Sequence, residues 1–573
     1  MFARYALAVG RGAHRHALLA RSQSIGLTKT AETSDLLLVA PEDTPLLTDG
    51  RSILVGQLFS GGNERVEILP PEIASAGSSA LGHALEGYWG NYALFFACRD
   101  QAGAYREPSG SVSVHRCGPG DQTYFVSDAE LAMQLGILAA PRADLHFAVH
   151  WLQFPFLRTR RTGLEDISEL LPGMLGARDG SGPWVETSIW HPGAFVGRDL
   201  AITDAAAAET RIRELALSVV PAQAGSHGIA LRLSGGLDSS IIAACLSNAG
   251  RDFSAINFVT RSPDGDERLY AREVATQCGA PLQEIAEPEG GTLELPARHS
   301  FRPTINPLLA PFERAARGAA TGVHASLLLD GAGGDNLFCS ISTASPVLDA
   351  LRAGGFRQAA GTITDIAERA NCTLWDVVLA ATRRSVRRRP RWKEDRSFLA
   401  TDCTVRRELH PWLERLDAPP GKREHVEAIV HIQHFLDRGV SPVSLLHPLL
   451  AQPLLELCLR IPSWMWLSGG RDRAVARDAF AGIVPASVLR RRAKGSLQSM
   501  FHRSFSRLRE EMLDLLLSGE LRAAGIIDPA SIEAALGGDG WMADEVQLRI
   551  SEMVALELWL QSWRSPSTCS SVP

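Results

Sequence analysis

One short segment of the chain holds the residues with the clearest potential for chemistry. It consists of Leu233, Ser234, Gly235, Gly236, Leu237, Asp238, Ser239 and Ser240. Its glycines permit a tight turn that approaches a ligand closely, and the free N–H groups at the start of a following helix bind anions. Its serines add hydroxyl donors. These features predict a loop that binds the phosphates of a nucleotide, with all the residues of the segment as its contacts.

Asp238 is the unusual member of this loop, because a carboxylate beside a phosphate repels it. A divalent cation between the two groups removes the repulsion, and Mg²⁺ binds carboxylate and phosphate oxygens together. The sequence therefore predicts Mg²⁺ at Asp238. The alternative is a plain strand–turn–helix connection with an aspartate near the helix start, where aspartate is common.

The loop differs from the common phosphate-binding pattern G-x-x-x-x-G-K-[ST], which the sequence does not contain. Gly421-Lys422 comes nearest, and Arg423 follows it instead of serine or threonine. A glycine–glycine–aspartate loop of this other type suits chemistry in which ATP releases pyrophosphate and transfers AMP. We therefore expect the loop to activate a carboxylate as an acyl-adenylate.

The elements around the loop predict a parallel sheet covered by helices. An apolar strand over residues 229–233 leads into the loop, and a helix follows over 239–248. Further strand-like runs at 254–259 and 325–329 alternate with helical stretches, as in βαβ units. From about residue 350 onward the pattern is mainly helical.

The first part of the chain has a different character. Short apolar runs at 52–56, 92–98 and 123–127 predict buried strands, with turn residues around them. The change falls near Asp204, where an alanine-rich helix begins. We therefore expect a sheet-rich domain over residues 1–204 and a second domain over 205–573, with a Ser/Pro/Thr-rich tail at 565–573.

Composition excludes several classes of protein. The chain has 573 residues, 45% of them hydrophobic, and a net charge of −6, which gives no reason to expect a nucleic-acid binder. The basic run at 383–393 contains a tryptophan, but a solvated loop, or a surface for an acidic partner or leader peptide, explains it better. Its nine dispersed cysteines predict reduced thiols. We find no membrane span or signal peptide, so we expect a cytoplasmic protein.

The loop resembles the pyrophosphate loop of the asparagine synthetase superfamily, and other segments extend the resemblance. Residues 327–338 (L-L-L-D-G-A-G-G-D-N-L-F) resemble its second motif, usually S-G-E-G-x-D-E-x-F. Other segments similar to those of the family occur at 265–271, 447–456, 469–480 and 484–485, and in the first part of the chain at 90–95, 125–128 and 171–173. This resemblance implies an α/β chain, in which an N-terminal glutaminase-like (Ntn-type) β-rich α+β domain precedes a parallel-sheet PP-loop ATP pyrophosphatase synthetase domain with a helical C-terminal part.

The resemblance also implies roles for residues outside the loop. Asp335 follows a buried strand as Asp238 does, so both carboxylates can reach the crevice at the carboxyl edge of a parallel sheet and hold Mg²⁺. Asp330 and Gly331 correspond to residues near the adenosine of ATP. Ile256 matches a position beside the adenine, although it can equally be strand core.

Two basic residues correspond to cations of the family. Lys494 matches a late lysine that stabilises charge during adenylation or amide formation, and such stabilisation is usually a large catalytic effect. The alternative for Lys494 is a solvated basic face over residues 490–494. Arg473 matches a lysine expected to contact phosphate.

Departures from the family pattern restrict the reaction. The glutamine-dependent members use a cysteine at residue 2, whereas this chain has Phe2 and no cysteine before Cys98. Ala332 and Asn336 stand where the second motif has glutamates. We therefore expect that the first domain makes no ammonia from glutamine and that asparagine synthesis is disfavoured.

Among members without glutaminase activity, the chain is most similar to the cyclases that form the isopeptide bond of lasso peptides. These adenylate an Asp or Glu side chain of a ribosomal precursor peptide, and the N-terminal amine of that peptide closes a macrolactam. The resemblance implies a leader peptidase and a leader-binding protein as partners. The alternatives are a β-lactam or carbapenam type of intramolecular amide synthetase, an ammonia-dependent asparagine synthetase, and an inactive scaffold homologue.

Overall fold

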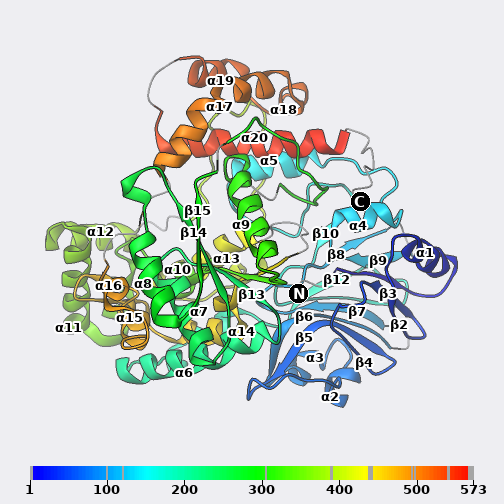
Figure 1. The fold of residues 1–573 in the computed structure, drawn as a ribbon, viewed down its shortest axis with the longest axis horizontal. Helices are drawn as coiled ribbons and strands as arrows, with labels where there is room; N and C mark the ends of the chain where they lie inside the picture. Colours follow the sequence, from blue (N-terminus) through cyan, green and yellow to red (C-terminus); the bar gives the residue numbers. More distant parts are fainter. Residues whose placement is uncertain are drawn as a thin grey trace.

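In a computed structural model of the chain, the described residues are 4–98, 101–118, 122–288, 290–303, 306–386, 391–436, 443–491, 495, 498–538 and 542–564, the side chains of 98 and 264 excepted (Figure 1). Phe2, Lys494 and the tail at 565–573 lie outside these residues. The molecule is a mixed α/β structure with a β-rich first part and a parallel sheet in the second. No helix in the described ranges is long and apolar enough to cross a membrane.

The first part contains two antiparallel sheets of six strands each. One has the order β10-β8-β9-β1-β3-β2, and the other β12-β11-β7-β6-β5-β4. The strands are β1 (Ala6–Val9), β2 (Lys29–Glu32), β3 (Leu36–Ala40), β4 (Leu46–Thr48), β5 (Ser52–Ser60), β6 (Tyr88–Cys98), β7 (Gln101–Arg106), β8 (His115–Cys117), β9 (Thr123–Val126), β10 (Ser168–Glu169), β11 (Met174–Asp179) and β12 (Val185–Ser188). The three strands predicted here are confirmed as β5, β6 and β9.

Side chains alternate between the two faces of each strand and so build three apolar layers. In β1, Leu7 points into the core between the two sheets, whereas Ala6 and Ala8 point to the other face. That outer face packs against α1 (Ala13–Ser24), α4 (Ala129–Gln134) and α5 (Leu145–Gln153). The outer face of the second sheet is covered by α2 (Pro71–Ala74) and α3 (Leu81–Ala84).

The second part is built on a parallel sheet of five strands with the order β15-β14-β13-β16-β17. These are β13 (Ile229–Arg232), β14 (Ser254–Val259), β15 (Leu282–Ala286), β16 (Leu327–Leu329) and β17 (Ser444–Leu446). The helices α6 (Ala205–Ala224), α7 (Leu237–Asn248) and α8 (Arg268–Cys278) contribute to the core on one face, and α9 (Ala310–Gly322) covers the other. The predicted parallel sheet is thus confirmed. The helix α6 continues through Pro221.

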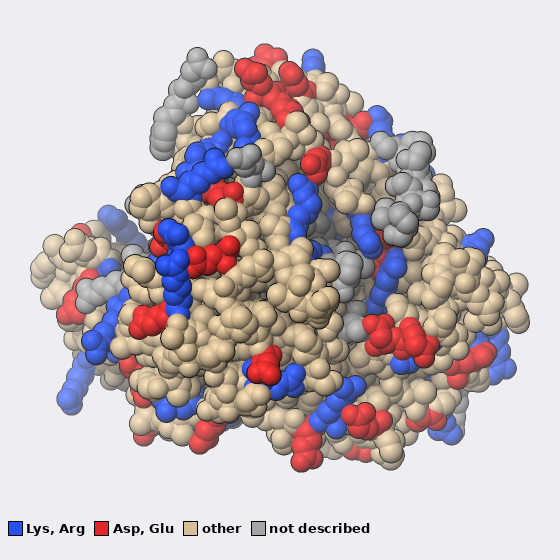
Figure 2. All heavy atoms as spheres, in the orientation of Figure 1, with Lys and Arg blue, Asp and Glu red and all other residues tan. Residues whose placement is uncertain are grey.

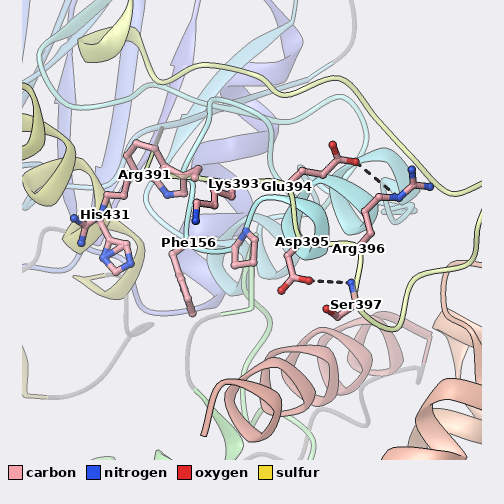
Figure 3. Close-up of a pocket in the computed structure, with 10 residues that line it drawn as sticks. Phe156, Arg391, Lys393, Glu394, Asp395, Arg396, Ser397 and His431 are labelled. Carbon is pink, nitrogen blue, oxygen red and sulfur yellow. Dashed lines mark hydrogen bonds and ion pairs between the residues drawn. The ribbon is translucent and has the colours of Figure 1, made fainter. Parts of the chain in front are cut away.

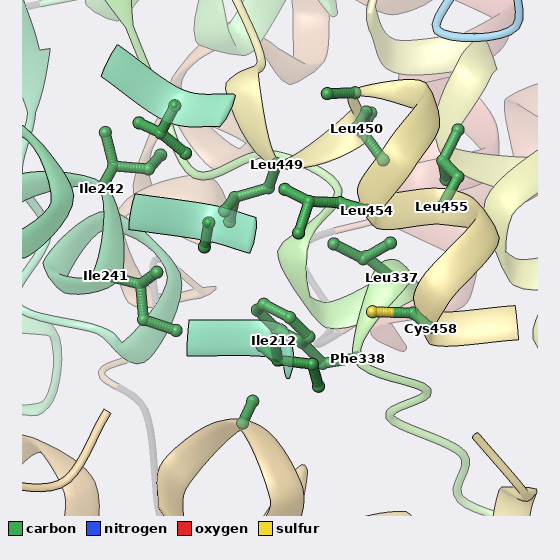
Figure 4. Packing of buried hydrophobic residues seen from close by; sticks show 14 of the residues in the cluster. Ile212, Ile241, Ile242, Leu337, Phe338, Leu449, Leu450, Leu454, Leu455 and Cys458 are labelled. Carbon is green, nitrogen blue, oxygen red and sulfur yellow. The ribbon is translucent and has the colours of Figure 1, made fainter. Parts of the chain in front are cut away.

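The helical region after residue 345 is also confirmed. It comprises α11 (Ser345–Ala370), α12 (Leu374–Val386), α13 (Pro420–Leu436), α14 (Gln452–Arg460), α15 (Ala474–Ala479), α16 (Ala486–Arg490), α17 (Gln498–Ser518), α18 (Glu520–Ala523), α19 (Pro529–Leu536) and α20 (Asp544–Arg564). Figure 4 shows Ile241 and Ile242 of α7 in the same core as Leu449, Leu450 and Leu454. This packing fixes the helix that follows the glycine-rich loop.

The last four helices pack against the first part of the chain. One apolar cluster joins α17 and α20 to β1 and α5, and Figure 1 shows α20 lying along α5. Trp559 of α20 closes over Gly163, where a Cβ atom would be 2.3 Å from the indole, and its Nε1 donates to the Ser300 carbonyl at 2.7 Å. The domain boundary at residue 204 remains a prediction, because this cluster contains residues from both sides of it.

A buried acid in α20 predicts a measurable dependence of stability on pH. Burial raises the pKa of Glu552 to about 7, with Arg549 opposing the shift. The folded protein keeps this proton at pH values where the unfolded chain, with a value of 4.5, has lost it. The resulting stability is full below the unfolded value and is lost as pH rises through about 7, by on the order of 3 kcal/mol. The Tm of Glu552→Gln, minus that of the wild type, should therefore rise from pH 5 to pH 8; a constant difference would contradict the assignment.

Charge is mixed on the surface. On the face drawn in Figure 2, lysine and arginine side chains lie among aspartate and glutamate side chains. This mixture is consistent with the small net charge of −6. The absence of a nucleic-acid partner stays a prediction.

Candidate active site

The glycine-rich loop lies at the carboxyl end of β13 and leads directly into α7. Gly235 has φ +71°, and a Cβ atom there would be 2.6 Å from the Cβ of Tyr270 in α8. Only glycine meets both conditions. Gly236 caps α7 without a side-chain bond, so the first N–H groups of a twelve-residue helix face the loop. The loop therefore has the geometry of an anion site.

The serines of the loop divide into two groups. Ser234 Oγ lies 3.2 Å from Ser239 Oγ, so both hydroxyls are on the same side of the turn. Ser240 is fully buried and donates to the Gly236 carbonyl at 2.7 Å. Ser240 therefore stabilises the helix start. The Ser239 hydroxyl makes a longer bond of 3.3 Å to the same carbonyl, and with Ser234 it is the hydroxyl placed to reach a phosphate.

The second motif lies against this loop. It follows β16 and continues into the short helix α10 (Gly334–Leu337). A Cβ atom on Gly334 would be 2.4 Å from Asp238 Cγ, and one on Gly331 would be 2.8 Å from the Ser239 nitrogen. The glycines of the second motif are thus required because the first motif occupies the space beside them. The two predicted motifs form one site.

Arg473 joins the two aspartates that the sequence singled out. Its Nη1 donates to Asp238 Oδ2 at 3.2 Å and also to Asp335 Oδ1. Asp238 is buried, whereas the Asp335 side chain is half exposed. Burial lowers the pKa of Arg473, but Asp238, Asp335 and Asp472 outweigh this effect, so that the pKa is raised. Arg473 also has φ +52°, which is uncommon for a bulky residue and marks a position held by its surroundings.

The same two carboxylates fit a magnesium ion. Both accept from one nitrogen atom, so their oxygens already converge on a single positive charge. Within the described ranges, no group of three or more His, Cys, Asp or Glu side chains could hold a metal by itself. Mg²⁺ typically binds one or two carboxylates and completes its shell with water and substrate phosphates. The donor set at Asp238 and Asp335 therefore suits Mg²⁺ that arrives with a nucleotide.

The residues predicted near the adenosine occupy two environments. Ile256 is buried between the sheet and α9, in contact with the same core as Leu328. Asp330 is buried at the carboxyl end of β16, where it accepts from the Ala332 N–H at 3.0 Å and from His447. Gly331 follows at the junction of the two motifs. Ile256 is thus part of the core, while Asp330 and Gly331 lie at the edge of the sheet.

Lys494 lies outside the described residues, but its neighbours along the chain bind beside the loop. Arg491 forms an ion pair with Glu267 at 2.8 Å, and the Gly495 N–H donates to the same carboxylate at 2.9 Å. The Glu267 carbonyl would be 3.1 Å from a Cβ atom on Gly235. Glu267 therefore holds Arg491 and Gly495 next to the phosphate loop. Glu267 belongs to the segment 265–271, which was identified only by its resemblance to the family. Nothing in the sequence predicted that Glu267 would contact Arg491 and Gly495.

A cavity of about 730 Å³ lies between residues 155–156, residues 391–397 and His431 (Figure 3). Figure 3 shows Phe156 of the first part and His431 of α13 beside Arg391 and Lys393, at one end of the cavity. At the other end, Glu394 and Arg396 pair with each other at 3.8 Å. The first end is thus lined by cationic and aromatic side chains, which suits an anionic ligand.

The helix α13 connects this cavity to the site. Asn336 of the second motif donates through Nδ2 to the Ala428 carbonyl at 2.7 Å. His431 follows three residues later, about 4.5 Å further along the axis of the helix. Its ring packs on Phe156, with the ring centroids 5.3 Å apart. Within the basic run, Arg384 is on α12 and pairs with Glu424, instead of lying in a solvated loop.

The fold and site define a parallel-sheet protein with a phosphate-binding loop and a two-carboxylate site at its carboxyl edge. The family model for asparagine synthase matches residues 215–561, which is more than half of the chain. The chain therefore belongs to the asparagine synthase family, whose members are ATP-dependent, AMP-forming amide ligases. The family resemblance predicted from the motifs is confirmed.

Other comparisons add little. No curated protein matches the sequence. Among solved structures, the allosteric regulatory enzyme of purine biosynthesis is 8% identical over 51% of this chain and 76% of that chain, with a TM-score of 0.20. Glutamine phosphoribosylpyrophosphate amidotransferase from B. subtilis is 8% identical over 57% and 90%, with a TM-score of 0.23. At these TM-scores neither similarity bears on the function.

Replacing Arg473 tests whether its bridge to the two carboxylates matters for adenylation. In Arg473→Ala, Asp238 and Asp335 face each other without this cation, and we expect AMP formation to fall by about 10²–10³-fold. Arg473→Lys keeps the charge but loses the planar fork, so the loss should be about tenfold. Arg471→Ala, which removes a partner of Asp478, is the matched control. Equal rates in Arg473→Ala and Arg471→Ala would refute the role.

Proposed function

We propose that the chain closes a macrolactam in a ribosomal precursor peptide. It adenylates the side-chain carboxylate of an aspartate or glutamate in that peptide, and the peptide's N-terminal amine then forms the isopeptide bond. The observation that carries the proposal is the convergence of Asp238 and Asp335 on Arg473, beside a loop shaped for phosphates. The lasso peptide cyclases are the class of enzyme that this reaction defines.

The residues of the site divide the first step among them. The N–H groups at the start of α7, with Ser234 and Ser239, bind the phosphates that leave as pyrophosphate. Asp238 and Asp335 would hold Mg²⁺, which supplies positive charge to the phosphate oxygens when bound. A carboxylate oxygen of the peptide attacks the α-phosphorus, and the bond to pyrophosphate breaks. The product is the acyl-adenylate.

The second motif supports an amine other than ammonia. Ala332 carries no acidic group, and Asn336 donates a hydrogen bond from its side-chain amide to the Ala428 carbonyl. The positions where the family pattern has glutamates therefore present no carboxylate to hold an ammonium ion. An amine that belongs to the activated molecule does not need such a site, because it is already nearby.

The cavity beside α13 is our candidate for the body of the peptide. Arg391 and Lys393 would attract acidic side chains, and Phe156 offers an apolar face. The lining comes from both parts of the chain, so the first part would contribute to peptide binding even without glutaminase chemistry. A leader peptidase and a leader-binding protein are proposed partners of this reaction.

Incubation with ATP, Mg²⁺ and a candidate precursor peptide tests the proposal. We expect AMP and pyrophosphate to form only with the peptide, and the peptide to lose the mass of one water. The matched control is the same peptide with an acetylated N-terminus, which should still release pyrophosphate but should not cyclise. Turnover on a small β-amino acid would favour the β-lactam type of synthetase, and no nucleotide binding would favour a scaffold.

A further inference from the structure

Asp330 and His447 form a buried pair at the carboxyl edge of the parallel sheet. The strands β16 and β17 are neighbours with Leu329 opposite Leu446, so the next residue of each strand meets the other. His447 Nδ1 lies 2.5 Å from Asp330 Oδ1. Asp330 is 7% exposed and His447 is 8% exposed, so water reaches very little of the pair. They stand 117 positions apart in the sequence.

Further contacts orient the Asp330 carboxylate. The Ala332 N–H donates to Oδ1 at 3.0 Å, and Arg232 Nη1 lies 3.6 Å from Oδ2. Arg232 is itself held by both oxygens of Glu313 in α9, at 2.9 and 2.6 Å. A carboxylate in this position can only accept from the imidazole, so His447 Nδ1 carries the proton.

The other nitrogen of His447 is therefore a lone-pair acceptor. Nε2 is buried and has no hydrogen-bond partner among the residues that the structure describes. A buried polar atom without a partner costs free energy, so its presence needs a reason. His425 also has one buried nitrogen without a described partner, but its other nitrogen faces the Leu337 carbonyl. A carbonyl, unlike the Asp330 carboxylate, carries no charge to stabilise an imidazolium.

The pair stands next to the site of adenylation. Asp330 continues into Gly331, which packs against Asp238 and Ser239. His447 continues into the turn η6 (Pro448–Leu450), and Leu450 packs on Gly333 of the second motif. The chain on both sides of the pair thus contacts the two motifs that would bind the nucleotide.

We propose that His447 is the general base of the amide-forming step, with Asp330 as its positioning residue; this inference rests on the proposed function. The peptide's amine nitrogen attacks the carbonyl carbon of the acyl-adenylate, and the new C–N bond forms. His447 Nε2 takes the proton from that nitrogen, and the bond between carbon and the AMP oxygen breaks with its electron pair leaving on AMP. Asp330 stabilises the imidazolium through the Nδ1–H, as a carboxylate does for a catalytic histidine.

Separate assays of the two half-reactions test this role, with the peptide that supports AMP release by the wild-type enzyme. Peptide-dependent exchange of pyrophosphate into ATP reports adenylation alone, and so it also reports whether the proposed function holds. In His447→Gln we expect exchange within about threefold of the wild type and macrolactam formation lowered by about 10²–10⁴-fold. Asp330→Asn should lower macrolactam formation by about tenfold more than it lowers exchange.

Two controls separate a base from a structural residue. Added imidazole should restore part of the macrolactam formation of His447→Ala in a saturable way, which a packing role would not produce. His502→Gln removes another histidine that pairs with a carboxylate, Asp544 at 2.9 Å, and should leave both half-reactions unchanged. A parallel loss of exchange and macrolactam formation in His447→Gln would overturn the proposal, as would macrolactam formation near the wild-type rate.

Discussion

Replacing Asp238 with asparagine is expected to abolish the formation of AMP, one of the two largest effects that we predict. The variant keeps the shape of the side chain but removes the charge that, with Asp335, would hold Mg²⁺ against the phosphates of ATP. We expect peptide-dependent AMP release to fall by at least about 10³-fold, which corresponds to about 4 kcal/mol of transition-state stabilisation. The measurement is AMP release at saturating ATP and Mg²⁺.

The fold should survive this change. Arg473 keeps Asp335 and Asp472 as partners in the variant, so no buried cation is left alone. An unchanged Tm would show that the loss is chemical. Asp402→Asn, at an exposed aspartate, is the matched control and should be active. A rate near that of the wild type in Asp238→Asn would show that Asp238 does not hold the metal.

The second strong expectation concerns Gly334, where alanine should disable the site. The added Cβ atom would lie 2.4 Å from Asp238 Cγ and 2.5 Å from its Oδ1, so the carboxylate must move. A displacement of about 1 Å in a catalytic group costs about 10²-fold in rate, and we expect a fall in AMP release of that order. The overpacked contact should also lower stability by about 1–3 kcal/mol.

Gly318→Ala is the matched control for this variant. Gly318 lies in α9, and a Cβ atom there would meet nothing within 4 Å. The replacement should leave activity unchanged and should stabilise the helix by up to about 1 kcal/mol. If Gly334→Ala and Gly318→Ala released AMP at the same rate, the close contact between the two motifs would have no catalytic importance.

Sequence patterns predicted the parts of this molecule that depend on local signals. The strands β5, β13 and β14 are apolar runs bounded by turn residues, and each was predicted close to its observed place. The strand β17 was not predicted, because it has only three residues and joins the sheet beside β16 after a long helical insertion. A run of that length carries no periodicity that distinguishes a strand from a helix.

In the site, too, local signals were predicted from the sequence and contacts between distant segments were not. The loop around Asp238 was predicted because glycines, serines and an aspartate follow an apolar strand in one short segment. The pairing of Asp330 with His447 and the bridging position of Arg473 result from contacts between distant segments. Such contacts arise only when the sheet brings the ends of its strands together. Lys494 stays a prediction by resemblance.

The first part of the chain shows why a domain boundary is harder to predict than a motif. The change in composition near Asp204 is real, since α6 begins at the next residue. Yet α20 returns to pack Trp559 against Gly163, with a hydrogen bond to the Ser300 carbonyl. The packing of α20 on the first part cannot be predicted from local composition, because an apolar helix face does not specify which surface will cover it.

The most direct test of carboxylate activation follows an oxygen atom. The precursor peptide is prepared with ¹⁸O in its reactive side-chain carboxylate and is converted by the enzyme with ATP and Mg²⁺. If the carboxylate attacks the α-phosphorus, one labelled oxygen leaves with AMP, and the other stays in the new amide. We therefore expect mass spectrometry to find one ¹⁸O atom in AMP and none in pyrophosphate. Label in pyrophosphate or inorganic phosphate, or unlabelled AMP alongside a cyclised peptide, would contradict the acyl-adenylate.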